Sequence, residues 1–266
     1  MVRYSTALPQ IRTKRVLFLH GTFVHPENYH RLFELFPTWD FVCPTLIGHG
    51  LNSCEETGTL DADAQVEMLL EFVRSQDEDY DILMGHSFGG TLAVHLNEKL
   101  KFARVVLLAP AIAPAPSGDS VISKIGQLPL WAMKILASLL SRVTYPMDPG
   151  SALMADLTVT TRLQILRERL DDPLAISTSP ICDLVPFLIS MRTILEGLVG
   201  KYTLCSTTTT IILGEHDRLI DMPSTQRFLR SLRVSPVVIP GVGHEIYNEN
   251  KFFETALQEA IHGDVQ

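Results

Sequence analysis

Cysteine is scarce in this chain, and its placement excludes two kinds of site. Among 266 residues there are four cysteines, Cys43, Cys54, Cys182 and Cys205, and no two of them form a C-x-x-C pair. Scattered cysteines of this kind argue against a dense disulfide framework and against a cysteine-based zinc site. They favour a reducing compartment, so we expect a cytoplasmic protein and no metal site.

Long apolar runs and long basic runs are absent as well. No run of 18 apolar residues free of charge occurs, so no transmembrane segment is expected. The first 15 residues also lack the apolar core of a secretory signal. The net charge is −8 and the basic residues form no long run, which disfavours nucleic acid as a partner. The sequence leaves the oligomeric state open, a homodimer included.

What the chain does contain is an alternation of short apolar runs and helical patterns. This order is typical of an α/β domain with a mostly parallel central sheet flanked by helices. We predict strands at 15–21, 41–50, 81–87, 104–110, 207–217 and 235–244, and helices at 27–36, 61–76, 88–100, 223–232 and 250–261. Pro44 suggests an edge or irregular position for the second strand, because proline cannot donate to a ladder.

The alternation stops after residue 110 and resumes near residue 207. Three apolar stripes at helical spacing occupy the interval, with no strand pattern among them. We therefore predict a core made of residues 1–114 and 199–266, with a helical cap inserted at 115–198. The cap leaves the sheet at the carboxyl end of a strand. Parallel sheets bind ligands at that end, so we expect the cap to cover the functional site.

The stretch "GHSFGG", residues 85–90, places Ser87 where a buried strand passes into a helix. A G-x-S-x-G sequence in that context is typical of a nucleophile held on a sharp turn. Bulky side chains two residues before or after Ser87 would collide in so tight a turn. The helix that follows also directs backbone N–H groups at the site, which favours developing negative charge.

A serine nucleophile needs a base, and the base needs an orienting acid. If the acid precedes the base, His244 and His262 are the candidates for the base, and we favour His244 in the glycine-rich "GVGHE". For the acid, Asp217 comes directly off a predicted strand in "IILGEHD", and Asp221 is the second candidate. All three favoured residues then follow parallel strands, where such sheets bind ligands.

These motifs together resemble the α/β-hydrolase family, and in particular its capped lysophospholipase and monoacylglycerol-lipase branch, which is serine aminopeptidase-like. The resemblance is carried by "LFLHG" (17–21), "GHG" (48–50), "GHSFGG" (85–90), "LGEHD" (213–217) and "GVGHE" (241–245). A shorter likeness lies in "DDPLAISTSP" (171–180) within the predicted cap. Phe88 stands where many lipases of the branch have methionine, so the turn does not identify a substrate.

The resemblance implies a catalytic triad of Ser87, Asp217 and His244, with no cofactor. It also implies an oxyanion hole formed by the backbone N–H groups of Thr22 and Phe88, or of Phe23 if the loop is shifted by one residue. His20 is expected to support this loop or simply to pack, and His49 and His86 are expected to be structural. For the substrate pocket we expect Phe23, Trp131, Met133 and Leu184. The alternatives for Trp131 and Met133 are contact with a lipid surface or simple packing in the cap core.

The function expected from this pattern is hydrolysis of carboxylic esters through an acyl-enzyme on Ser87. Short-to-medium acyl esters and monoacylglycerol- or lysophospholipid-like lipids are the expected small-molecule substrates. An aminopeptidase or a carbon–carbon bond hydrolase would use the same triad. A non-catalytic ligand-binding protein on this fold is a further alternative, although such proteins often lose a triad member.

Overall fold

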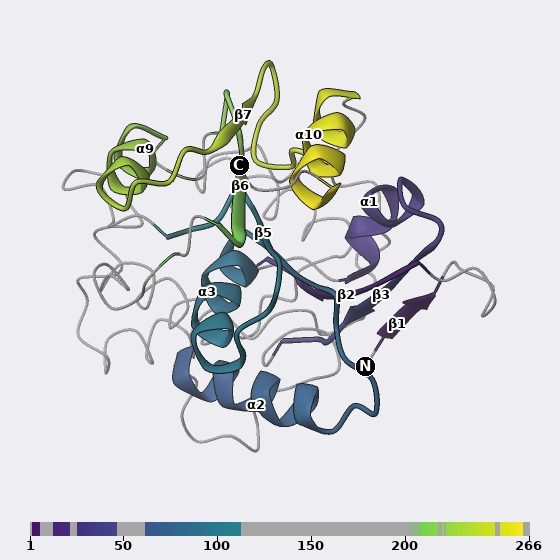
Figure 1. Ribbon diagram of the computed structural model, residues 1–266. Helices are drawn as coiled ribbons and strands as arrows, with labels where there is room; N and C mark the ends of the chain where they lie inside the picture. The colour runs from purple at the N-terminus through teal and green to yellow at the C-terminus, as the bar shows by residue number, and fades with distance from the viewer. Residues whose placement is uncertain are drawn as a thin grey trace, which may run out of the picture.

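The strands of the computed structural model form one mostly parallel sheet (Figure 1). The structure describes residues 2–5, 13–21, 26–46, 62–112, 204, 207–217, 220, 222–247 and 251–262. Within these ranges seven strands lie in the order β1-β3-β2-β4-β5-β6-β7, and every neighbouring pair is parallel except β1 with β3. The strands are β1 (Val2–Ser5), β2 (Lys14–Leu19), β3 (Trp39–Cys43), β4 (Ile82–His86), β5 (Val105–Leu108), β6 (Thr209–Gly214) and β7 (Val237–Ile239).

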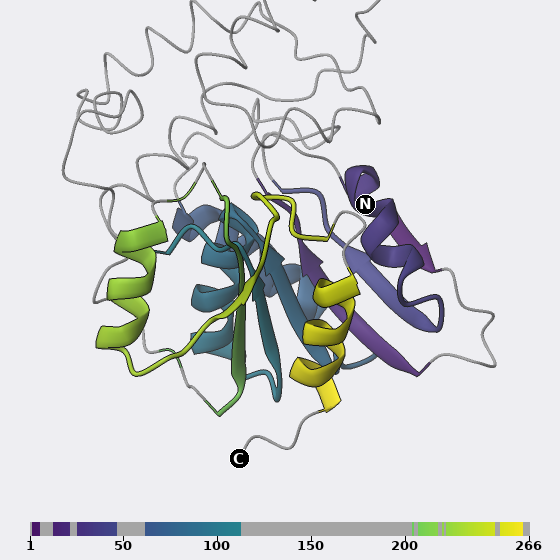
Figure 2. The same ribbon diagram turned by 90° about the horizontal axis from the view of Figure 1, so that it is seen from above.

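Helices cover both faces of this sheet, which confirms the predicted α/β class. They are η1 (Pro26–Tyr29), α1 (His30–Glu34), α2 (Ala62–Arg74), α3 (Phe88–Leu100), α9 (Met222–Ser231) and α10 (Lys251–His262). Side chains alternate across each strand, so one set packs against α2, α3 and α9 and the other against α1 and α10. Figure 2, seen from above, shows α1 and α10 in front of the sheet and α3 behind it.

Two features of the sheet differ from the sequence prediction. Strand β1 was not expected, and it pairs antiparallel with β3, from Val2 opposite Cys43 to Ser5 opposite Asp40. As a result β3 lies inside the sheet and not at its edge. Pro44 did not prevent this, because β3 ends at Cys43 and the proline follows its last paired residue.

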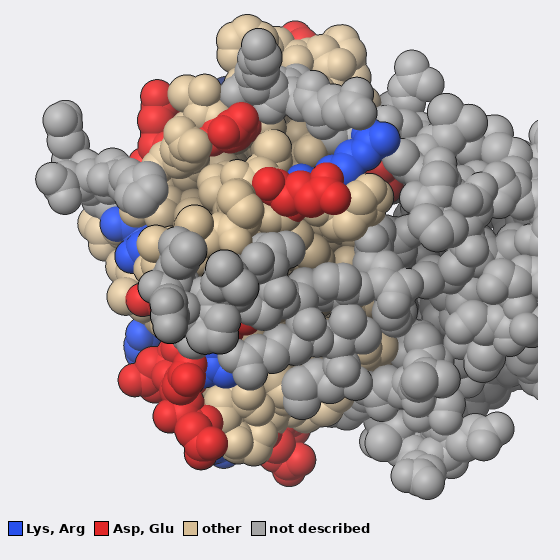
Figure 3. Space-filling model, turned by 90° about the vertical axis from the view of Figure 1, so that its right-hand side faces the viewer, with Lys and Arg blue, Asp and Glu red and all other residues tan. Residues whose placement is uncertain are grey.

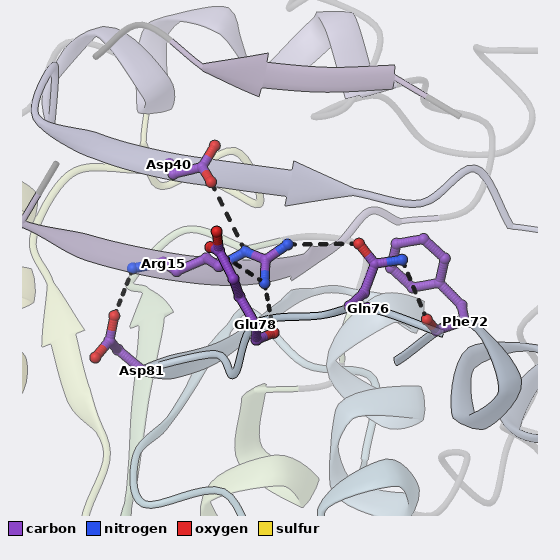
Figure 4. Close-up of polar contacts among 6 residues, drawn as sticks. All are labelled: Arg15, Asp40, Phe72, Gln76, Glu78 and Asp81. Carbon is purple, nitrogen blue, oxygen red and sulfur yellow. Dashed lines mark hydrogen bonds and ion pairs between the residues drawn. The ribbon is translucent and has the colours of Figure 1, made fainter. Parts of the chain in front are cut away.

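A buried arginine ties together the amino-terminal ends of β2, β3 and β4 (Figure 4). The Arg15 guanidinium lies 3.7 Å from an Asp40 carboxylate oxygen, and it donates to the Glu78 carbonyl oxygen. It also lies over the Tyr80 ring, 4.5 Å from the ring centre. The backbone N–H of Arg15 donates to Asp81 Oδ2 at 2.6 Å. This network lies at the opposite end of the strands from Ser87.

On the face shown in Figure 3, acidic and basic side chains lie beside one another over the described part of the molecule. No helix among the described residues is both long enough and apolar enough to cross a membrane.

Several predicted features lie outside the described residues. They include the cap at 115–198 with Trp131, Met133 and Leu184, the loop residues Thr22 and Phe23, His49, and Asp221, the second candidate for the acid. The division of the chain into core and cap therefore stays a prediction. The strands that precede and follow the predicted cap, β5 and β6, are direct neighbours in the sheet.

Candidate active site

Ser87 forms the whole turn between β4 and α3. Strand β4 ends at His86 and α3 begins at Phe88, so one residue must reverse the direction of the chain. Ser87 accordingly has φ 52° and ψ −119°, outside the regions that side-chain-bearing residues favour. Its N–H donates to the Leu108 carbonyl at 2.9 Å, and its own carbonyl accepts from the Ala111 N–H at 3.1 Å. The end of β5 thus fixes the serine backbone on both sides.

The glycines around Ser87 permit close approach of the backbone. A Cβ atom on Gly85 would lie 2.4 Å from the Gly89 carbonyl oxygen. A Cβ atom on Gly89 would lie 2.1 Å from the carbonyl oxygen of Leu19 in β2. Neither position can hold a side chain unless the backbone moves. This agrees with the expectation that side chains two residues before or after Ser87 would collide.

Asp217 and His244 are brought together by loops that follow β6 and β7. His244 Nδ1 lies 2.7 Å from Asp217 Oδ2, and both side chains are buried. Asp217 Oδ1 in addition accepts the N–H of Ile220 at 3.1 Å. Each carboxylate oxygen of Asp217 therefore accepts a hydrogen bond that helps to orient it. His262, the other candidate for the base, is the last residue of α10.

The chemistry of this pair defines the tautomer of His244. An ionised carboxylate only accepts hydrogen bonds, so Nδ1 must carry the proton that is shared with Asp217. In the neutral ring the lone pair then lies on Nε2. A histidine held in this way can take a proton at Nε2 while the carboxylate stabilises the resulting cation.

The loop after β2 approaches Ser87 closely. A Cβ atom on Gly21 would lie 3.2 Å from Ser87 Cβ and 3.3 Å from His86 Nδ1. Thr22, which follows Gly21, was predicted from the sequence to contribute an oxyanion donor. On the other side of Ser87, Phe88 is the first residue of α3 and is buried. The first N–H groups of a helix have no acceptor within their own helix, so they are available to an anion.

His86 is buried and connects three segments of the site. Its Nε2 lies 3.1 Å from the carbonyl oxygen of His244, and its Nδ1 lies 2.8 Å from the Tyr29 hydroxyl. The two histidine rings are 4.8 Å apart, centre to centre. Burial and the neighbouring His244 lower the pKa of His86 to about 3, against an opposing effect of the bond to the His244 carbonyl. The ring is consequently neutral at physiological pH.

Tyr29 also belongs to this site, although the sequence did not predict it there. Its hydroxyl oxygen accepts the N–H of Gly21 at 2.9 Å, and burial raises its pKa well above the usual value, so it stays protonated. No motif marks Tyr29, which lies at the end of η1 inside a segment predicted only as helix. His20, by contrast, was expected to support the loop, and its Nδ1 lies 2.8 Å from the Gly21 carbonyl oxygen.

Within the described ranges, no three His, Cys, Asp or Glu side chains are arranged to hold a metal ion. The groups that the described part of the site does offer are a serine on a strained turn, an imidazole paired with a buried carboxylate, and the first N–H groups of a helix.

Comparison with known proteins places these groups in a family context. The model of the alpha/beta hydrolase family matches residues 16–255 of the chain. The lipase LipV of Mycobacterium tuberculosis is 37% identical over 101 residues, which are 37% of this chain and 38% of that protein. A putative esterase/lipase of Mycoplasma genitalium is 33% identical over 106 residues, 38% of this chain and 40% of that protein. The chain thus matches less than half the length of these relatives.

Solved structures resemble the chain over nearly its whole length. A monoacylglycerol lipase of Paleococcus ferrophilus matches with a TM-score of 0.60 at 20% identity, covering 98% of this chain and 96% of its own. MenH of S. aureus matches with a TM-score of 0.64 at 16% identity, covering 100% and 98%. At such low identity these matches show a shared fold and nothing finer.

Proposed function

The chain belongs to the alpha/beta hydrolase family, and on that premise we propose that it is a serine hydrolase of carboxylic esters. The observation that carries the proposal is the buried 2.7 Å contact between His244 Nδ1 and Asp217 Oδ2, with the His244 ring packed near His86, the residue that precedes Ser87. An aspartate that orients a histidine next to a serine nucleophile is the arrangement that acyl transfer requires. Sequence relatives named as a lipase and as putative esterases support the choice of an ester over other substrates.

The reaction proceeds in two halves. Ser87 Oγ attacks the ester carbonyl carbon while His244 Nε2 takes the hydroxyl proton, and Asp217 stabilises the imidazolium. The C–O bond to the alcohol then breaks, and the leaving alcohol receives the proton from His244. Water attacks the acyl-enzyme with His244 again as base, which releases the carboxylic acid and restores Ser87.

The negative charge on the tetrahedral oxygen is stabilised by two backbone donors. In this proposal they are the N–H groups of Phe88 and of Thr22, with Phe23 as the alternative in the second position. The place of Phe88 at the start of α3 and the contact of Gly21 with the Ser87 turn support this assignment. Removal of one donor of this type typically lowers the rate by about 10² to 10³-fold.

We propose short-to-medium acyl esters or monoacylglycerol-like lipids as substrates. The predicted cap at 115–198 would cover Ser87, and Phe23, Trp131, Met133 and Leu184 would line the acyl pocket. The adjacency of β5 and β6 supports this location, because a segment inserted between them leaves the sheet on the side of Ser87.

The test is the loss of reaction in Ser87→Ala. The purified protein is assayed on p-nitrophenyl esters of graded chain length, a monoacylglycerol and an aminoacyl anilide, and is labelled with a fluorophosphonate probe. Ser87→Ala should fold, lose labelling and lose about 10³-fold or more in kcat/KM on esters. Ser75→Ala is the matched control, since Ser75 is an exposed residue just after α2. Undiminished ester turnover in Ser87→Ala contradicts the proposal, and turnover of the anilide alone moves it to amide substrates.

A further inference from the structure

Tyr29 and His86 lie outside the proposed triad, yet their polar atoms bridge its parts. The Tyr29 hydroxyl lies 2.9 Å from the backbone nitrogen of Gly21 and 2.8 Å from His86 Nδ1. His86 Nε2 lies 3.1 Å from the carbonyl oxygen of His244. One continuous set of contacts therefore runs from the loop after β2, through the residue that precedes Ser87, to the loop that carries His244.

The direction of every hydrogen bond in this set follows from its two ends. A carbonyl oxygen can only accept, so His86 Nε2 must carry the ring proton that it donates to His244. The ring is neutral, so His86 Nδ1 is an acceptor, and the Tyr29 hydroxyl must donate its hydrogen to it. The hydroxyl oxygen is left to accept the N–H of Gly21. Only one assignment satisfies all three contacts.

Burial makes this arrangement hard to replace. Tyr29, Gly21, His86 and His244 are all buried, and the rings of Tyr29 and Tyr247 pack against the His86 ring. A buried donor or acceptor that loses its partner is destabilising, so the loops have little freedom to move apart.

From this geometry we infer that Tyr29 and His86 are positioning residues that hold the Gly21 loop and the His244 loop in fixed register with the Ser87 turn. The inference rests on the proposed ester hydrolysis for its effect on rate. Neither residue exchanges a proton with substrate.

Gly21 is the point at which the positioning affects the reaction. Its N–H is held by Tyr29, and its carbonyl oxygen accepts from His20 Nδ1 at 2.8 Å. That carbonyl belongs to the same peptide group as the N–H of Thr22, the proposed oxyanion donor. Because a peptide group is planar, a restraint on its carbonyl restrains the whole group. Loss of the Tyr29 hydroxyl releases one of the two restraints on Gly21.

The first experiment compares Tyr29→Phe with a matched core variant. Tyr29→Phe keeps the ring and should lower kcat on p-nitrophenyl acetate about 10- to 100-fold, with KM changed less than about threefold, because misplacement by about 1 Å costs up to 10²-fold. Phe41→Leu lies in the same apolar cluster, without a part in these hydrogen bonds. It should lose as much thermal stability and keep kcat within about twofold. A wild-type kcat in Tyr29→Phe overturns the inference. A decrease of kcat in Phe41→Leu as large as that in Tyr29→Phe overturns it too.

A double-mutant cycle tests whether Tyr29 and His86 act together. His86→Phe removes both ring contacts, so adding Tyr29→Phe to it should lower kcat by less than about threefold more. His86→Gln retains an N–H donor for the His244 carbonyl and should recover part of the loss. If the decrease of kcat in the double variant equals the product of the decreases in the two single variants, the two residues act independently and a shared role is contradicted.

NMR separates this inference from the proposed function. In Tyr29→Phe, the amide of Gly21 and the ring nitrogens of His244 should both shift, whatever reaction the site performs. A shift confined to Gly21 overturns the coupling. If these shifts occur but Ser87→Ala keeps its ester turnover, the positioning network stands and the proposed reaction fails.

Discussion

At the scale of single residues, the orientation of His244 depends on one carboxylate. Asp217 accepts from His244 Nδ1 at 2.7 Å and from the Ile220 N–H at 3.1 Å. In Asp217→Asn, an amide N–H₂ facing Nδ1 would favour the tautomer with its proton on Nε2, which cannot accept the Ser87 proton. We expect kcat to fall by about 10³-fold or more with little change in KM.

The matched variant for this prediction is Asp221→Asn, at the second candidate for the acid. It should keep kcat within a few-fold of the wild type in the same ester assay. If Asp221→Asn is the damaging change and Asp217→Asn is not, the acid has been assigned to the wrong residue.

At the scale of elements, the exits of β6 and β7 must pack closely for Asp217 to reach His244. A Cβ atom on Gly214, the last residue of β6, would lie 2.1 Å from the Gly243 carbonyl oxygen. Gly214→Ala should therefore push the two loops apart and reduce both kcat and stability. The measurements are ester kinetics and thermal unfolding.

Gly241 gives the contrasting variant, in the loop after β7 that Gly214 approaches. It has φ +72°, and a Cβ atom there would have no other atom within 4 Å. Alanine would therefore strain the backbone without a steric clash. Gly241→Ala should cost about 1 kcal/mol of stability and leave kcat nearly unchanged. If both variants lose the same activity, the close approach of Gly214 to Gly243 is not what keeps Asp217 and His244 in contact.

The sequence predicted the six parallel strands because each is a short apolar run, and all but β7, where Val237 and Val238 are exposed, are largely buried. It overestimated their length: among the described residues of the run at 41–50, only 41–43 lie in β3, and within 235–244 only Val237–Ile239 form a strand. Apolar residues at strand exits are buried by loops as well as by ladders, and composition does not separate the two. Strand β1 has four residues and pairs with a distant segment, so no local pattern predicts it.

The site was predictable where chain order and local turns define it. Ser87, Asp217 and His244 each follow a strand, and the structure brings the last two into contact. The link through Tyr29 was not predictable, because it depends on η1 presenting a hydroxyl to a loop eight residues earlier and to a strand 57 residues later. No spacing rule in the sequence encodes such a three-way contact.

At the scale of the whole molecule, the two ends of the sheet should serve different purposes. Arg15 is buried with Asp40 at the amino-terminal ends of the strands, and Ser87 lies at the other end. Arg15→Met leaves the Asp40 carboxylate buried without this cation and should cost about 3 kcal/mol or more of unfolding free energy. The kcat/KM on esters should stay within about twofold at temperatures where the variant is folded. A large loss of kcat/KM in a folded Arg15→Met protein would show that the two ends are coupled.

Acid should destabilise the whole molecule through His86. Its pKa in the folded protein is about 3, below the value near 6.5 of an unfolded chain, because of burial and the neighbouring His244. The unfolded state alone therefore binds a proton between these values. The contribution of His86 to stability is complete above pH 6.5 and is lost as the pH falls toward 3, by about 2 kcal/mol at pH 5.

Urea unfolding at pH 7 and pH 5 tests this linkage. The groups packed on His86 are Tyr29, Tyr247 and His244, with Asp217 opposing the effect. His86→Gln removes the titrating ring, so it should be less stable than the wild type at pH 7 but lose less between the two pH values. An identical loss in both proteins would contradict the role of His86.

Hydrogen exchange of the proton on His86 Nε2 can also measure how often the turn at Ser87 opens. It is donated to the His244 carbonyl inside a buried cluster of aromatic rings, so exchange with solvent requires the loops around it to separate. Its rate of replacement by deuterium would therefore report how often the site opens, with no substrate present. If that rate equals the rate of global unfolding, the turn opens only when the domain unfolds. If it is faster, the reaction centre has an opening motion of its own.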